Sequence, residues 1–74
     1  MIKLIFLRDA IWYNYKNNFK FKKDYIVYGN KKIDGIYEII VDDAGRYYYV
    51  SFSEFYVMPF AEYRMKRINE IFQD

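Results

Sequence analysis

The sequence predicts a mainly β protein, a small barrel of about five antiparallel strands followed by one C-terminal α-helix. Short runs rich in Ile, Val, Tyr and Phe alternate with turn-forming clusters over the first 58 positions. Residues 37–55 form the clearest pattern, because two such runs flank the hairpin turn Asp42-Asp43-Ala44-Gly45. After Pro59, the apolar residues recur at helical spacing. We expect one domain over residues 1–74, with the barrel in 1–58 and the helix in 60–72.

The first elements follow from the apolar runs. Residues 2–7 are apolar except for Lys3, which predicts a strand buried on much of both faces. Rings alternate on both sides of the polar triplet at 16–18, which predicts a hairpin with a three-residue loop. In that register Tyr15 faces Phe19 and Tyr13 faces Phe21. A short helical turn or an irregular loop over 9–15 is the alternative.

The middle of the chain predicts three further strands. A strand over 25–28 ends at the polar turn cluster 29–32, and Asp34-Gly35 suits either a bulge or a second turn. In the next strand, 36–41, alternation places Tyr37, Ile39 and Val41 on the core side. Gly45 can take positive φ at no steric cost, and the strand 46–51 then returns antiparallel.

The last elements are a turn, a short strand and the helix. Ser51 and Glu54 have capping-box spacing, which predicts a single helical turn over 51–55 before a strand over 56–58. We interpret the helix as a cap on an open end of the barrel; the alternative is that a partner protein binds it. One stripe of the helix is apolar at four-three-four spacing: Ala61, Met65, Ile68 and Phe72.

Part of this pattern matches a known kind of fold. The matching residues are Phe19, Tyr25, Tyr37, Ile39, Asp42, Asp43, Gly45, Tyr49 and Phe55. From about Phe19 to Val57, the chain resembles small bacteriophage proteins of SH3-like β-barrel type, although Lys22 stands where that pattern has Gly. Most such proteins have no assigned activity. The resemblance therefore implies a fold and a viral context, but no mechanism. The apolar run at the N-terminus is too short for a signal peptide, so we expect a cytoplasmic protein, here in the host cell.

Composition excludes several function classes. The chain has no Cys and no His, so disulfides and the usual zinc sites are excluded. No segment approaches the roughly 20 apolar residues that span a bilayer, so we expect no membrane partner. Ten Tyr, seven Phe and one Trp exceed what one small core should hold. Exposed rings then indicate a contact site or a homodimer interface, unless they simply cover strands with their hydroxyls in water.

An enzyme is not expected. Nucleophilic catalysis would depend on Ser51, Ser53 or carboxylates, since His, Cys and Thr are absent. Asp42 and Asp43 are better explained as turn formers beside Gly45. We therefore predict no catalytic residues, no metal and no cofactor.

Two sets of residues are candidate binding surfaces. The first interleaves rings and cations, as single-stranded nucleic-acid and nucleotide sites do. The second is acidic and could mimic nucleic-acid phosphates toward a basic protein surface. The basic-aromatic set is Trp12, Tyr13, Tyr15, Lys16, Lys20, Lys22 and Lys23, and the acidic set is Glu38, Asp42, Asp43 and Glu54.

Together these patterns favour a non-enzymatic, phage-type binding protein. We expect it to engage a host protein and to inhibit or redirect it, for example as an anti-defence inhibitor similar to anti-CRISPR proteins. The alternative is a module that binds single-stranded nucleic acid or a nucleotide through segment 12–23.

Overall fold

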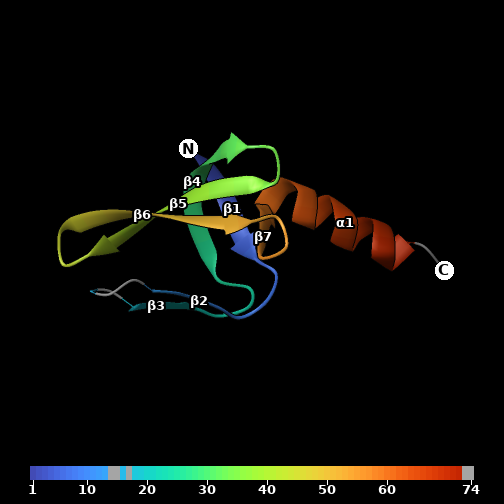
Figure 1. The fold of residues 1–74 in the computed structure, drawn as a ribbon. Helices are drawn as coiled ribbons and strands as arrows, with labels where there is room; N and C mark the ends of the chain where they lie inside the picture. Colours follow the sequence, from blue (N-terminus) through green and yellow to red (C-terminus); the bar gives the residue numbers. More distant parts are fainter. Residues whose placement is uncertain (14–15, 17, 73–74) are drawn as a thin grey trace.

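A computed structural model describes residues 1–13, 16 and 18–72, and this part of the chain forms seven strands and one helix (Figure 1). The elements are β1 (Ile2–Phe6), β2 (Ala10–Tyr13), β3 (Asn18–Phe21), β4 (Ile26–Ile33), β5 (Ile36–Asp43), β6 (Arg46–Ser53), β7 (Val57–Pro59) and α1 (Phe60–Phe72). Five strands make an antiparallel sheet in the order β6-β5-β4-β1-β7, and β2 and β3 make a second sheet. The predicted class, mainly β with a C-terminal helix, is confirmed. The described pairings leave β6 and β7 as sheet edges, so they do not close a barrel.

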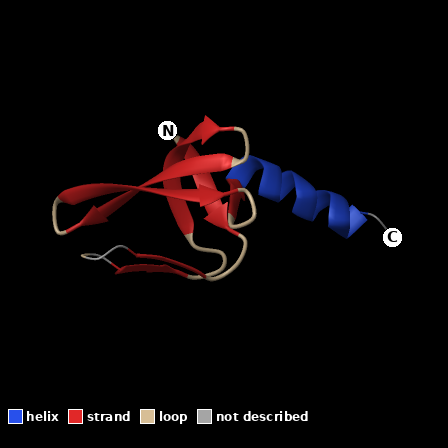
Figure 2. Cartoon of the chain, in the orientation of Figure 1, coloured by secondary structure: helices blue, strands red, loops and turns tan. Residues whose placement is uncertain are grey.

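The core joins the two sheets through aromatic rings. Phe6 of β1 stacks on Phe21 of β3 with ring centroids 4.7 Å apart, and Phe52 of β6 meets both rings edge-on. Leu4, Ile5 and Phe6 are consecutive and all buried, so both faces of β1 are covered, as predicted. Figure 2 shows the β2–β3 hairpin lying along one side of the longer β5–β6 hairpin.

The predicted register of the first hairpin is wrong. Trp12 lies opposite Phe19, and Ala10 lies opposite Phe21. β2 therefore ends at Tyr13 and β3 begins at Asn18, and the expected place of Tyr15 lies outside the described residues. The observed register stacks Trp12 on Phe19, with centroids 5.8 Å apart, and places small Ala10 beside Phe21 in the core. Packing against the larger sheet thus decides the register of this hairpin. The alternation of rings along the sequence could not predict that register.

The turn predicted at 29–32 is also wrong, because β4 continues to Ile33. Gly29 lies opposite Ile39, and a Cβ at Gly29 would collide with the carbonyl oxygen of Glu38. Glycine here permits close approach of two strands rather than a turn. The chain reverses instead at Asp34-Gly35, where Gly35 has a φ of 80° and Ile33 lies opposite Ile36. The register shift lies before this turn, between Lys31 and Ile33, so Asp34-Gly35 is the turn of the two predicted alternatives and not the bulge.

The β5–β6 hairpin is confirmed. Its pairing runs without a shift from Ile36 opposite Ser53 to Asp43 opposite Arg46. Ala44 and Gly45 have φ values of 54° and 84°, the two positive values of a type I′ turn. The Gly45 N–H donates to Asp42 Oδ1 at 3.2 Å.

The predicted faces of this hairpin are confirmed, but its far end differs. Tyr37 and Ile39 are buried, and Val41 packs against the core. β6 extends to Ser53, so the single turn follows that residue rather than starting at Ser51. The Tyr56 N–H donates to the Ser53 carbonyl at 2.9 Å, which closes the turn. Longer pairing with β5 has displaced the expected cap at Ser51.

The helix begins directly after β7 and has the predicted bounds, but it does not cap the sheet. It contacts β1 and β7 near its start, where Phe60 and Tyr63 are half-buried. The rest projects away from both sheets, at the opposite end from the β5–β6 turn (Figure 1). The Cα atoms accordingly span 48 × 21 × 21 Å. Met65 and Ile68 of the apolar stripe stay exposed, so the interpretation of α1 as a barrel cap is wrong.

Candidate functional site

The structure divides the predicted basic-aromatic set between two faces of the β2–β3 hairpin. Tyr13 is 72% exposed and lies on the outer face with exposed Lys20. Trp12 lies on the inner face against Phe19. The Phe19 ring in turn packs on Tyr48 of β6, with ring centroids 5.3 Å apart. These rings therefore cannot stack together on one ligand.

The lysines of this set are spread over different parts of the chain. Lys16 is exposed between the two strands of the hairpin, whereas Lys22 and Lys23 are exposed in the connection from β3 to β4. The Lys23 N–H donates to Asp9 Oδ1 at 2.8 Å, which fixes the backbone of that connection. The ammonium group of Lys23 takes no part in that bond.

The acidic set is also dispersed. Asp42 and Asp43 end β5 at the hairpin tip, whereas Glu54 follows β6 at the other end and lies beside Gly35. Six residues of strand separate Asp42 from that end, a span of about 20 Å. Glu38 lies between them and pairs with Lys32 at 3.9 Å. The four carboxylates therefore do not form one patch.

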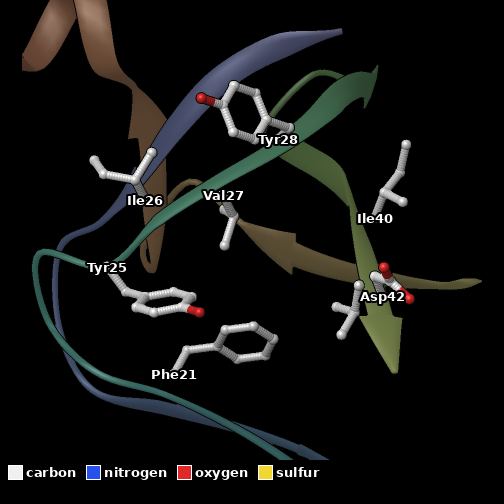
Figure 3. Close-up of a pocket in the computed structure, with 8 residues that line it drawn as sticks. Phe21, Tyr25, Ile26, Val27, Tyr28, Ile40 and Asp42 are labelled. Carbon is white, nitrogen blue, oxygen red and sulfur yellow. The ribbon is translucent and has the colours of Figure 1, made fainter. Parts of the chain in front are cut away.

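A pocket of about 260 Å³ opens where β4 and β5 diverge beyond the pair of Tyr28 and Ile40 (Figure 3). Tyr25 and Phe21 lie on one side of β4, and Tyr28 extends from the other, so the three rings do not enclose one space. The volume is below the roughly 300 Å³ at which sites for small molecules begin. Its lining is Phe21, Tyr25, Ile26, Val27, Tyr28, Ile40, Val41 and Asp42.

The outer face of the main sheet carries a row of side chains that sequence reasoning did not place. Lys3, Tyr28, Ile40 and Tyr49 are successive partners across β1, β4, β5 and β6. Tyr28 and Tyr49 are exposed. These two rings therefore cover strands at the surface, which was the second of the two explanations for the large number of aromatic residues. Alternation within one strand predicts which residues share a face of the sheet. The alignment of residues from four different strands depends on the strand registers, which the sequence did not reveal.

The apolar stripe of α1 faces away from the rest of the molecule. Phe60 and Tyr63 face the sheet, and Lys3 Nζ lies 4.4 Å from the Phe60 ring centroid. At 3.6 residues per turn, Met65 lies nearly opposite Phe60 and Tyr63, and Ile68 is turned away from them by roughly a third of a turn. Met65 and Ile68 of this stripe are 61% and 43% exposed. The stripe was visible in the sequence, but its outward orientation was not.

The two sides of the helix border two different hollows. On the outer side, Arg64 joins Ala61, Met65 and Ile68 around a shallow depression of about 250 Å³. On the inner side, a crevice of about 220 Å³ separates the helix from the end of the sheet. Lining residues of the crevice are Leu7, Lys23, Met58, Tyr63, Lys66, Arg67 and Glu70.

Within the described residues, no group of three or more carboxylates is placed to hold a metal ion. Nor does this part of the chain contain a helix with the length and apolar character of a membrane-spanning segment.

Comparison with known proteins adds no relative. No protein-family model matches the chain, and no curated protein or solved structure is significantly similar to it.

Proposed function

We propose that this protein is a non-enzymatic binding protein that engages another protein through the outward face of α1. One observation carries the proposal: Met65 and Ile68 of the apolar stripe are exposed, on a helix that projects away from the sheets (Figure 1). Surface helices normally turn such a stripe toward their own core. A stripe with the reverse orientation is typical of a helix that a partner covers.

The energetics support a partner for this helix. A helix of 13 residues is marginal in water on its own, and α1 packs on the sheet mainly through its first turns. Burying one of the exposed Ile or Met side chains completely would contribute about 1.5–3 kcal/mol. A partner groove would therefore stabilise the helix and gain affinity from the same contact.

The chemistry of the stripe indicates what kind of groove fits. Ala61, Met65 and Ile68 are apolar, and Arg64 borders the same depression. We infer an apolar groove with a carboxylate at its rim, opposite Arg64. A standard protein interface buries about 800 Å² on each partner. One side of a helix about 20 Å long offers less, so the groove must enclose the helix rather than touch one line of it.

The resemblance to phage proteins motivates the identity of that partner. We propose a host protein that is inhibited or redirected, with an anti-defence inhibitor as one form of this role. Self-association is a separate expectation from the ring content, and light scattering that gives only a monomer mass at high concentration would refute it.

Affinity capture from a nuclease-treated lysate of the proposed host cells tests the proposal. Three baits are compared: the wild type, Ile68→Glu on the stripe and Lys66→Glu on another side of the helix. We expect the wild type and Lys66→Glu to recover the same stoichiometric protein, and Ile68→Glu to lose it. Equal recovery by all three baits, or no reproducible protein with the wild type, would contradict the proposal.

A further inference from the structure

Two distant segments bring cations together in the crevice between α1 and the sheet. Lys23 comes from the β3–β4 connection, and Lys66 and Arg67 come from the helix. The hydrogen bond from the Lys23 N–H to Asp9 holds one wall, and the contacts of α1 with β1 and β7 hold the other. The arrangement therefore results from the fold, since more than 40 positions separate Lys23 from Lys66 in the sequence.

Within the described residues, none of these three cations forms an ion pair. Glu70 is the single carboxylate among the lining residues, so the crevice carries two positive charges in excess. Neither lysine nor Arg67 forms an ion pair within the described part of the chain, where the pairs are Lys31 with Asp34 and Lys32 with Glu38. Three unpaired cations around a concave surface create a positive potential that attracts an anion.

We propose that this crevice binds the phosphate group of a nucleotide, either free or within a single strand. Arg67 can donate two parallel hydrogen bonds to a phosphate, and the two lysines add point charges. Tyr63 lines the same crevice, and its ring is supported by Phe60 at 6.4 Å between centroids. A ring beside phosphate-binding cations suits a base joined to its phosphate.

This site differs from the nucleic-acid surface predicted over residues 12–23. Among the described members of that set, only Lys23 lines the crevice, because Trp12 packs inward and Tyr13 and Lys20 lie on the outer face of the hairpin. The site also lies on a different side of α1 from the apolar stripe. Phosphate binding is therefore independent of the protein partner proposed above.

Fluorescence anisotropy with labelled dT12 tests the inference, using full-length protein at 50 and 200 mM salt. If all three cations contact phosphates, the rise in salt should weaken binding about twentyfold. The double substitution Lys23→Gln with Arg67→Gln should weaken binding at 50 mM salt about tenfold and flatten the salt dependence. Lys20→Gln is the matched control and should leave both quantities unchanged. Circular dichroism checks that every variant is folded.

Unlabelled AMP and adenosine distinguish the source of the phosphate. Displacement of dT12 by AMP but not by adenosine supports a site for a free nucleotide. Crevice-dependent binding of dT12 that AMP does not displace supports a site for a strand. The inference is overturned if neither probe binds at 50 mM salt, or if the double variant binds as the wild type does. Ile68→Glu should keep phosphate binding, which separates this test from that of the protein partner.

Discussion

The ring of Phe6 in β1 stacks on the ring of Phe21 in β3, with centroids 4.7 Å apart and planes within 9° of parallel. This contact attaches the two-stranded sheet to the five-stranded one, and Phe52 closes it from the side. The position of the β2–β3 hairpin, and of the connection that carries Lys23, therefore depends on core packing.

Replacing Phe21 should release that hairpin. Phe21→Ala removes a buried ring and leaves a cavity, so we expect the free energy of unfolding to fall by about 3–5 kcal/mol. Tyr13→Ala, at an exposed position of the same hairpin, should cost far less. Urea denaturation followed by circular dichroism measures both, and similar losses for the two variants would contradict the packing described here.

Gly29→Ala should be strongly destabilising although the residue lies in a strand. A methyl group there would collide with the Glu38 carbonyl of the paired strand, so β4 and β5 would have to separate. We expect a loss of about 1–3 kcal/mol in thermal or urea unfolding. Gly29 in a solvent-exposed turn, as the sequence suggested, would tolerate alanine with little change.

Ala44 is a position where stability can be gained. Its φ of 54° is unfavourable for a residue with a Cβ, whereas Asn-Gly is the preferred pair in a type I′ turn. Ala44→Asn should therefore raise the free energy of unfolding by about 0.5–1 kcal/mol. Ala44→Val is the matched opposite and should lower it. The two shifts in melting temperature should have opposite signs; the same sign for both would argue against this turn.

Charge on the helix stripe should hardly affect folding. Ile68 is exposed in the free protein, and Glu is at least as good a helix former as Ile. We expect Ile68→Glu to change stability by less than about 0.5 kcal/mol. A loss as large as that of Phe21→Ala would mean that the stripe packs within the molecule after all.

Local sequence signals predicted the elements well, and long-range contacts account for the differences. The Ala44-Gly45 turn and the bounds of α1 follow from residues adjacent in the chain, and both are as expected. The role of Gly29 depends on Glu38 of the neighbouring strand, so the sequence suggested a turn there instead. The register of Trp12 depends on β6, which packs behind Phe19, so the sequence suggested a different pairing.

The candidate site depended even more on tertiary structure. The apolar stripe of α1 was readable from its spacing, but the same spacing suits a helix that caps a sheet or one that projects from it. Lys23 was identified among other lysines, whereas its neighbours Lys66 and Arg67 come from the helix and could not be connected with it. Only the placement of α1 brings these three cations together.

The central claim is that the outward stripe of α1 contacts a partner protein. Photo-crosslinking in the proposed host cells tests it most directly. A benzophenone amino acid replaces Ile68 in one variant and Lys66 in another, two positions that differ mainly in the side of the helix they occupy. The account predicts a discrete protein adduct from position 68 and a much weaker one from position 66. No adduct at position 68, or equal adducts at both positions, would contradict it.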